Sequence, residues 1–199
     1  MAWQKGILVV AAYIIGSIPT GYLICRWRAG LDLRQSGSGN IGATNVARTL
    51  GVRWGVLVLL LDMAKGALPV SLALLLGYAQ PESRATWAAL AGSAAFLGHI
   101  YSLFLHFRGG KGVATAFGVS LLLMPQAALA ALAIFSFVCW KWRYVSLASL
   151  LASLSLVFWA ALFNYPRAFL ALTILFALLI TIRHRENLSR LRQGREHRW

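Results

Sequence analysis

The chain has 199 residues, of which 59% are hydrophobic and only 12% are charged, and its mean hydropathy is +0.69. A soluble domain carries about 25% charged residues, so this composition excludes an ordinary soluble protein and favours an integral membrane protein. The net charge is +14, from 19 Lys and Arg against 5 Asp and Glu. Because no soluble basic domain carries this charge, we interpret it as a topology signal and as attraction to anionic membrane lipids, with no nucleic-acid partner.

Apolar runs long enough to cross a bilayer follow one another along the chain, since a helical span needs roughly 20 residues. We expect spans at residues 5–25, 54–77, 86–107, 112–140, 144–163 and 167–182. The fourth run would be roughly 43 Å long as a helix, which exceeds an apolar core of roughly 30 Å. Met124-Pro125 is a natural break within this run. Splitting it there predicts an all-α protein with seven transmembrane helices, some of them short or partly re-entrant near Pro125.

The basic residues decide the predicted orientation. With seven spans, the Arg and Lys residues of segments 26–53, 108–111, 141–143 and 183–198 all face one side, while Lys5, Arg84 and Arg167 face the other. The positive-inside rule therefore predicts an outside N-terminus and a cytoplasmic C-terminus. We expect a single membrane-embedded domain over residues 1–199.

Small polar residues gather between the first two expected spans, at residues 36–48. Glycines expose backbone N–H groups to a ligand, Ser, Thr and Asn add neutral hydrogen bonds, and Arg48 is a forked cation suited to phosphate. We expect Thr44 to cap a short helix that ends near Leu50, with Asn45 and Arg48 on one face. The loop would then lead into a helix N-terminus, which is a ready anion site. An interfacial helix with a flexible Gly/Ser turn is the alternative.

Two further polar segments fall on the same predicted side. Residues 108–112 combine three glycines with Lys111 at the start of a membrane helix, so backbone amides, a helix dipole and an ammonium group would converge there. The Walker A spacing is missing, so nucleotide hydrolysis is not expected. Residues 184–196 place His184 and Asn187 on one helical stripe. The three segments can converge into one site, although a positive-inside anchor and an Arg-rich stop signal are the alternatives for the second and third.

A few other polar residues have two possible roles. Asp62 and Lys65 lie inside the second expected span at i,i+3 spacing, where functional support and a buried structural pair are both open. For His99, in the third expected span, we favour a hydrogen-bonded histidine of the core. Ser146 and Ser149 could line the site or make polar contacts between helices.

Together these segments resemble the bacterial PlsY-type acyl-phosphate:glycerol-3-phosphate acyltransferases over essentially the whole chain. The matching residues are Gly37-Ser38-Gly39-Asn40-Ile41-Gly42-Ala43-Thr44-Asn45 with Arg48, then Gly109-Gly110-Lys111-Gly112-Val113-Ala114-Thr115, and then His184, Asn187, Arg190, Gly194 and Glu196. The resemblance implies transfer of an acyl group from a fatty acyl-phosphate to the primary hydroxyl of glycerol 3-phosphate. The products would be lysophosphatidic acid and phosphate, made at the cytoplasmic face of a bacterial cytoplasmic (inner) membrane.

The resemblance also assigns expected roles to residues. It implies that Ser38 and Arg48 are essential, that the glycines around Lys111 form a phosphate-binding loop, that His184 and Asn187 matter for activity, and that Glu196 matters for structural integrity. The candidate catalytic residues are Ser38, Arg48, Lys111, His184 and Asn187. The candidate substrate-binding residues are Gly37, Gly39, Asn40, Thr44, Asn45, Gly109, Gly110, Gly112 and Ser149. No cofactor is expected, and the scattered acids and histidines predict no metal site.

The expected mechanism is direct attack of the glycerol hydroxyl on the acyl-phosphate. Either His184 or the phosphate of the donor could accept the proton, because both titrate at roughly pH 6 to 6.5. An acyl-enzyme on Ser38 is the rival, and the lack of an obvious base beside it counts against it. A transporter or exchanger for a phosphorylated metabolite is the alternative function. Polar motifs on one side of the membrane and the lack of a visible inverted repeat disfavour transport.

Overall fold

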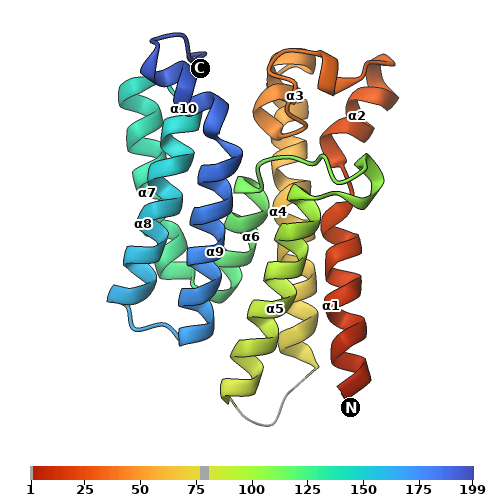
Figure 1. Cartoon of the computed structure of the whole chain (residues 1–199), viewed down its shortest axis with the longest axis vertical. Coiled ribbons are helices and arrows are strands. Elements are labelled where there is room, and N and C mark those ends of the chain that lie inside the picture. Colours follow the sequence, from red (N-terminus) through yellow and green to blue (C-terminus); the bar gives the residue numbers. More distant parts are fainter. Residues whose placement is uncertain (1, 77–80) are drawn as a thin grey trace. The chain divides into compact units, whose positions relative to one another are not determined.

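A computed structural model describes residues 2–76 and 81–199, and within these ranges all regular structure is helical. Residues 1–119 and residues 120–199 form two compact units, whose helices follow one another in chain order (Figure 1). Gly77, the expected end of the second span, lies outside the described residues. The predicted all-α class is confirmed.

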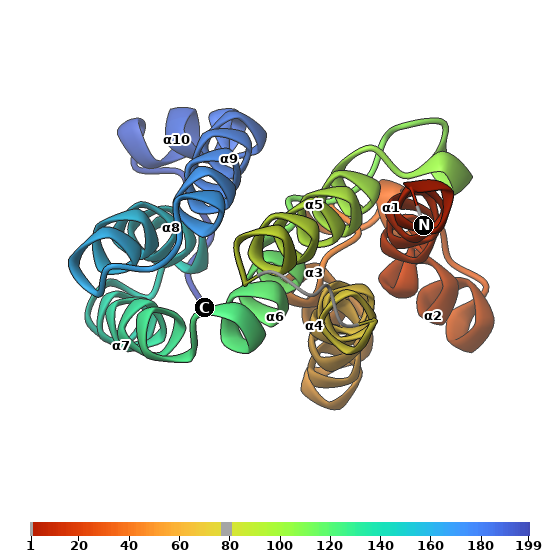
Figure 2. The ribbon, with the colours of Figure 1, turned by 90° about the horizontal axis from the view of Figure 1, so that it is seen from below.

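The first unit contains α1 (Ala2–Ser17), α2 (Thr20–Ala29), α3 (Ala43–Leu50), α4 (Val52–Leu75), α5 (Pro81–Ile100) and the first turns of α6 (Val113–Leu123). Helix α5 packs against α1 and α4 (Figure 2). Glycines make the α1–α5 contact close, since a Cβ on Gly16 would overlap the Ala95 carbonyl and one on Gly98 would overlap the Tyr13 carbonyl. Such small residues let helix backbones approach within a membrane, where close packing drives association.

The first expected span is broken into two helices. Helix α1 ends at Ser17 and α2 begins at Thr20, whereas the sequence analysis predicted one helix over 5–25. Pro19 explains the break, because proline lacks an N–H and disfavours helical conformation in the residue before it. Two distant side chains satisfy carbonyls at the break: Lys65 Nζ donates to Ile18 O at 2.8 Å, and Ser102 Oγ donates to Ser17 O at 2.5 Å.

Helix α5, which corresponds to the third expected span, also ends earlier than predicted, at Ile100 in place of residue 107. The chain then makes a short 3-10 turn, Leu103–Leu105, and returns toward the end of α5. On returning, Gly109 N–H donates to Ile100 O and Gly110 N–H donates to His99 O, each at 3.0 Å. These bonds occupy carbonyls that a continuing α-helix would give to residues four positions later. The returning loop therefore ends α5.

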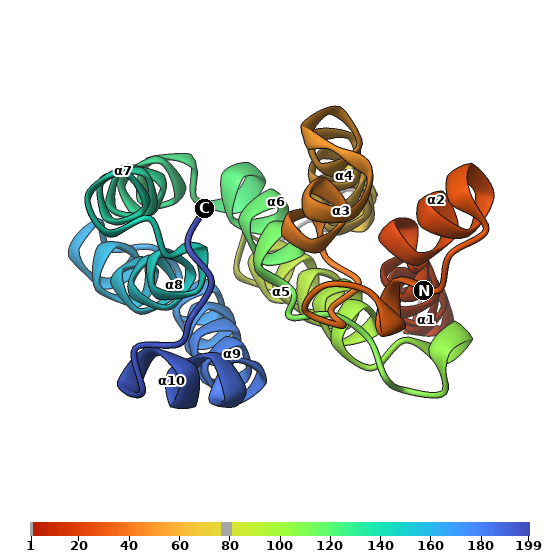
Figure 3. The ribbon, with the colours of Figure 1, turned by 90° about the horizontal axis from the view of Figure 1, so that it is seen from above.

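The second unit contains α7 (Pro125–Trp142), α8 (Val145–Leu162), α9 (Arg167–Arg183) and the short α10 (Arg185–Arg192). Helix α8 packs against both α7 and α9 (Figure 3). Helix α6 ends at Leu123 and α7 begins at Pro125, so the predicted break at Met124-Pro125 is present. The chain bends by 58° between α9 and α10, at His184.

The described residues include five helical segments long and apolar enough to cross a membrane, where α1 and α2 together count as one segment (Gly6–Ala29). The number is six if α9 and α10 count as one bent span. Helix α6 has only 11 residues, roughly 17 Å, which is shorter than an apolar core of roughly 30 Å. Leu59, Leu60 and Leu61 of α4 are 40%, 55% and 40% exposed. Consecutive exposed leucines suit a surface that faces lipid. The chain is an integral membrane protein, while the count of seven spans stays a prediction.

Candidate active site

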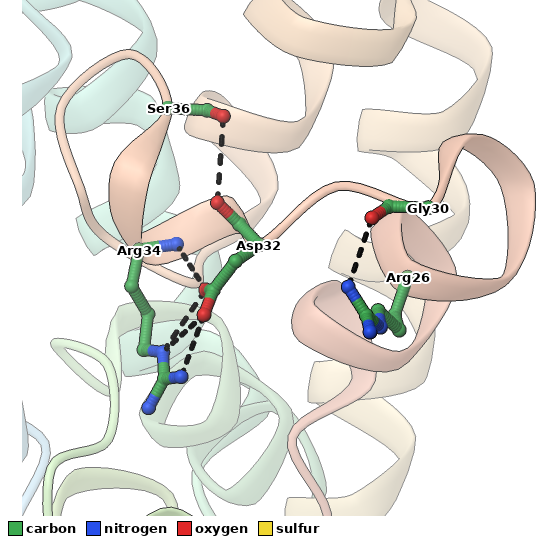
Figure 4. Close-up of polar contacts among 5 residues, drawn as sticks. All are labelled: Arg26, Gly30, Asp32, Arg34 and Ser36. Carbon is green, nitrogen blue, oxygen red and sulfur yellow. Dashed lines mark hydrogen bonds and ion pairs between the residues drawn. The ribbon is translucent and has the colours of Figure 1, made fainter.

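A tight turn stabilised by an ion pair precedes the first polar segment, residues 36–48. Asp32 caps the 3-10 turn Leu33–Gln35, and Arg34 folds back onto its carboxylate with Nη2 at 2.6 Å from Oδ2 (Figure 4). This side-chain hydrogen bond, together with one from the Arg34 backbone, lowers the pKa of Asp32 to about 2. Asp32 is thus ionised at neutral pH and neutralises Arg34, which leaves Arg48 as a cation without such a partner among the described residues.

Asn45 organises the loop that carries Ser38. Its side chain is 2% exposed and makes four hydrogen bonds to loop backbone. Nδ2 donates to the carbonyls of Ser36 at 2.9 Å, Asn40 at 2.8 Å and Leu33 at 3.4 Å, and Oδ1 accepts the Ser38 N–H at 2.9 Å. Its amide is therefore engaged with the protein itself. The predicted substrate-binding role of Asn45 is not tested by this geometry.

The loop leaves Ser38 exposed beside the helix that follows it. Gly37 and Gly39 adopt left-handed φ values of 58° and 71°, and a Cβ on Gly37 would overlap the Asn45 amide. Asn40 Oδ1 accepts the Gly42 N–H at 3.1 Å, which closes the turn just before α3. The loop thus leads directly into a helix N-terminus, as expected.

Helix α3 begins two residues earlier than predicted. Gly42, not Thr44, is its N-cap, and the helix runs from Ala43 to Leu50. Asn45 and Arg48 both lie on α3 at the predicted i,i+3 spacing, but Asn45 is buried against the loop while Arg48 is exposed. Helical spacing places two residues on adjacent positions, but burial depends on the distant segment packed there. Thr44, Ser38 and Arg48 remain the accessible polar groups of this motif.

Beneath this loop lies a small apolar cluster. Its buried members are Cys25, Leu33, Ile41, Val46, Val58 and Leu105. Leu33 and Ile41 bracket the loop at both ends and are 0% and 4% exposed. Their burial fixes where the loop begins and ends, so the exposed residues between them, Ser38 included, have a defined position.

The second polar segment, residues 109–112, is a loop held against the end of α5. The N–H groups of Gly109 and Gly110 donate to α5 carbonyls, and the predicted substrate-binding role of these two glycines is not tested by this geometry. Gly112 has φ of 81° and a Cβ there would overlap the ring of Phe96. These glycines thus have a packing reason for lacking a side chain. Lys111 follows at the half-buried end of the loop, directly before α6.

Buried polar residues of the second unit surround the start of α10. His184 is 2% exposed, and its Nδ1 lies 2.8 Å from Ile180 O. A carbonyl only accepts, so a neutral His184 carries its proton on Nδ1 and Nε2 is the basic nitrogen. Asn187 Nδ2 donates to Glu196 Oε1 at 2.6 Å, and Arg190 Nε donates to Glu196 Oε2 at 2.9 Å.

The Glu196 carboxylate binds the C-terminal segment to α10. Burial raises its pKa, but the hydrogen bonds from Asn187 and Arg190 outweigh burial, and the net pKa is lowered. Ser146 lies close enough to contribute to this lowering, although its Oγ makes no hydrogen bond of standard geometry with a described residue. Ser149, buried at the start of α8, donates to Val145 O of its own helix at 2.8 Å.

The first two motifs thus belong to the first unit, and His184, Asn187 and Ser149 belong to the second. A single site built from all three motifs joins residues of both units and stays a prediction.

Comparison with known proteins decides the family. A family sequence model described as "Glycerol-3-phosphate acyltransferase" matches residues 6–194. This chain belongs to that family. A glycerol-3-phosphate acyltransferase of Geotalea daltonii is 50% identical over 191 residues, covering 96% of this chain and 95% of that protein. One of Geobacter sulfurreducens is 48% identical over 193 residues, covering 97% and 96%.

Two crystal structures of PlsY (YgiH), an integral membrane glycerol 3-phosphate acyltransferase, are similar to this fold. The glycerol 3-phosphate form is 43% identical with a TM-score of 0.91, covering 98% of this chain and 96% of that chain. The lysophosphatidic acid form is 42% identical with a TM-score of 0.88, covering 98% and 95%. The resemblance noted from the motifs is confirmed, and the chain is an acyltransferase.

Sequence reasoning assigned no role to two residues, Thr20 and Thr115, that the structure connects to the polar groups discussed above. Thr20 hydrogen-bonds Asp62, and Thr115 hydrogen-bonds His99. For Thr20 the available signal was Pro19, whose helix-breaking effect leaves backbone carbonyls to be satisfied. Thr115 was identified only as the last residue of the second matching motif, and nothing in the sequence indicated that its hydroxyl would meet His99.

Proposed function

We propose that this chain transfers the acyl group of a fatty acyl-phosphate to the primary hydroxyl of glycerol 3-phosphate. The observation that carries the proposal is the glycerol 3-phosphate form of PlsY, which matches 98% of this chain with a TM-score of 0.91. The lysophosphatidic acid form of the same protein supports the product. The acyl-phosphate donor follows from the motif resemblance and fits the scarcity of acidic groups near the motifs.

The reaction needs little covalent help from the protein. The glycerol oxygen attacks the acyl carbonyl carbon, a new ester C–O bond forms, and the C–O bond to phosphate breaks. The hydroxyl proton goes to the departing phosphate or to His184 Nε2, which then passes it on. Both substrates are anions, so Arg48 and Lys111 supply the charge that binds them, and Ser38 supplies a neutral hydrogen bond. An oriented, water-poor site lowers the barrier by positioning.

The topology completes the proposal. We place seven spans in the membrane, with the N-terminus outside and the C-terminus and the three motifs in the cytoplasm of a bacterial cell. The distribution of basic residues supports this arrangement. A reporter protein that works only in the cytoplasm should be active when it is fused after Trp199. A periplasmic signal would contradict the orientation.

The decisive test is formation of lysophosphatidic acid by the purified protein in lipid. Glycerol 3-phosphate is supplied with acyl-phosphate, acyl-CoA or acyl-carrier protein as donor. We expect product from acyl-phosphate alone, and a loss of roughly 100-fold or more in Ser38→Ala and Lys111→Ala, since each removes a group that contacts substrate. Ser155→Ala is the control, because Ser155 Oγ bonds only the Ala152 carbonyl of its own helix.

Other outcomes would contradict separate parts of the proposal. Product from acyl-CoA alone would replace the donor. No product with any donor would remove the reaction, and flux of glycerol 3-phosphate across vesicles without a new lipid would indicate transport. Mass spectrometry that finds an acyl group on Ser38 would replace direct attack by an acyl-enzyme. Near-normal turnover of His184→Ala would leave the donor phosphate as the base.

A further inference from the structure

A buried charged pair lies in the middle of α4, outside the residues used above. Asp62 and Lys65 are 2% and 7% exposed, and Lys65 Nζ lies 2.8 Å from Asp62 Oδ1. Asp62 is roughly 15 Å along α4 from its start, well away from either end. Ionised groups at such a depth are costly and need partners. Thr20 Oγ1 donates to Asp62 at 2.5 Å, and Lys65 also donates to the Ile18 carbonyl.

His99 continues this pair toward the second motif. Its Nδ1 lies 3.7 Å from Asp62 Oδ1 and 3.1 Å from Thr115 Oγ1, and both His99 and Thr115 are buried, at 4% and 0% exposed. Both contacts are to Nδ1, which is within hydrogen-bond distance of a hydroxyl on the first turn of α6 and in electrostatic contact with the α4 carboxylate.

The Gly109–Lys111 loop rests directly on His99. Gly110 donates its N–H to the His99 carbonyl, and a Cβ on Gly110 would overlap the His99 ring at Nε2. A Cβ on Gly109 would overlap the His99 carbonyl. One histidine thus supports this loop through both its backbone and its side chain, and a change of ring position would move the loop.

The other end of the loop is held by α4 through the same threonine. A Cβ on Gly66 would lie 2.5 Å from the Thr115 carbonyl and 3.0 Å from its Cγ2, so α4 and the first turn of α6 are in close contact there. Figure 1 shows the start of α6 beside the middle of α4. Lys111 lies between these two attachments, His99 on one side and Thr115 on the other.

We infer that Asp62, His99 and Thr115 are positioning residues that hold the Gly109–Lys111 loop in the conformation that binds glycerol 3-phosphate. The inference rests on the proposed function, in which Lys111 binds an anionic substrate, and on the motif resemblance, which implies that this loop binds the phosphate of glycerol 3-phosphate. It gives the buried pair a role beyond stability. Asp62 orients His99, and His99 determines the position of the Gly109–Lys111 loop. Loss of the network would therefore weaken binding of glycerol 3-phosphate while leaving the acyl donor bound normally.

The sharpest test is Thr115→Val, which keeps the shape of the side chain and removes only its hydroxyl. We expect the KM for glycerol 3-phosphate to rise roughly 10-fold, with the KM for acyl-phosphate within about twofold of wild type. Thr173→Val is the matched control, since Thr173 is also 0% exposed but donates only to the Leu170 carbonyl of its own helix. A KM for glycerol 3-phosphate unchanged in Thr115→Val would overturn the inference.

A second set of variants separates positioning from stability. Asp62→Asn leaves the Lys65 charge without its counterion, whereas Asp62→Asn combined with Lys65→Met removes both charges. The double variant should recover the thermal unfolding temperature lost by the single one, but keep a KM for glycerol 3-phosphate raised roughly 10-fold or more. Recovery of both quantities would show that the pair acts only on stability.

The side chain of His99 offers a rescue experiment. Asparagine can place a side-chain amide near the position of imidazole Nδ1, whereas leucine cannot hydrogen-bond at all. We expect His99→Leu to raise the KM for glycerol 3-phosphate roughly 100-fold and His99→Asn to restore part of that loss. Equal effects of the two substitutions would contradict the role given to Nδ1.

Hydrogen exchange keeps this inference distinguishable from the proposed function. The amides of residues 109–115 should exchange faster in Thr115→Val and His99→Leu than in wild type and in Thr173→Val, whatever reaction the protein catalyses. If Lys111→Ala retains full activity, the proposed role of the loop fails although the exchange result stands. If Lys111→Ala is inactive and exchange in Thr115→Val is unchanged, the positioning inference fails alone.

Discussion

The two glycine-rich loops of the first unit are held in place by different chemistry. The Ser38 loop is organised by the neutral amide of Asn45, which bonds the backbone at four points. The Gly109–Lys111 loop bonds α5 carbonyls and rests on His99, whose ring faces the buried pair of Asp62 and Lys65. Both loops carry a candidate phosphate-binding residue, yet one is organised by a single neutral amide and the other rests on a histidine that lies beside a buried ion pair.

The depth of each loop accounts for the difference. The Ser38 loop is largely exposed and lies over α3, so water can solvate what the protein leaves unpaired, and one well-placed amide is sufficient to fix its backbone. The second loop rests on His99, whose ring faces the middle of α4, where an unpaired polar group costs far more. There the Lys65 ammonium pairs with the Asp62 carboxylate and donates to the Ile18 carbonyl at the α1–α2 break, and His99 Nδ1 lies 3.7 Å from the same carboxylate. Asp62, Lys65 and His99 thus take the place of water as partners for the polar groups beneath the Gly109–Lys111 loop.

Breaking the first loop should have the largest effect. Asn45→Ala leaves the Ser38 N–H and the Asn40 carbonyl without the amide that pairs them, and it removes one of the two hydrogen bonds to each of the Ser36 and Leu33 carbonyls. We therefore expect a loss of about 2–4 kcal/mol in unfolding free energy and roughly 100-fold or more in kcat/KM. Asn45→Asp should fail as well, since a carboxylate cannot donate to those carbonyls. Asn164→Gly is the control, because glycine adopts the φ of 53° freely. Near-normal activity of Asn45→Ala would show that the amide is dispensable.

Crowding the second loop should have the next largest effect. The Cβ in Gly110→Ala would overlap the His99 ring, and the loop has to move to accommodate it. We expect kcat/KM for glycerol 3-phosphate to fall roughly 10- to 100-fold. Gly6→Ala is the matched control, since nothing lies within 4 Å of its added Cβ, and its stability should be equal to wild type or higher by roughly 0.5–1 kcal/mol. Full activity of Gly110→Ala would mean that His99 does not set the loop.

The C-terminal segment is a third region to compare, because the charged Glu196 carboxylate binds it to α10. Glu196→Gln should lower the unfolding free energy at pH 7 by roughly 1–3 kcal/mol, as hydrogen bonds to a charged group weaken. The folded-state pKa of Glu196 is lowered, so its contribution is present above the ordinary value of 4.5 and is lost as pH falls through the folded pKa. Unfolding of wild type and variant from pH 7 to pH 3 should converge. A constant difference would exclude the charge as the cause.

The smallest effect should come from the exposed pair at the entrance of the Ser38 loop. Asp32→Asn removes the partner of Arg34, but solvent screens both groups, so activity should stay within about twofold of wild type. The lowered pKa of Asp32, about 2, means that any stabilisation is present at neutral pH and fades only between about pH 4 and pH 2. The measurement is activity at low and high salt. A large loss at both would give Asp32 a direct role in the site.

Local features of the fold were predictable from the sequence, and long-range ones were not. The helix break at Pro125 and the end of α3 at Leu50 follow from residue types within a few positions, so they were predicted correctly. The break at Pro19 was missed, because an otherwise continuous apolar run outweighed a single proline. The early end of α5 was missed for a different reason, since it depends on Gly109 and Gly110 returning from nine residues away or more to bond its last carbonyls.

For the candidate site, the sequence identified the residues but not their partners. Composition and the polar motifs by themselves determined a helical membrane protein and predicted anion-binding segments, because hydropathy and residue chemistry are properties of the chain alone. The resemblance of those motifs to a known family then indicated acyltransfer. Only the tertiary structure decided that Asn45 faces the loop, that the Gly109 and Gly110 amides bond α5, and that Asp62 meets His99. The physical reason is that a buried polar group must find a partner, and that partner lies on a segment distant in sequence.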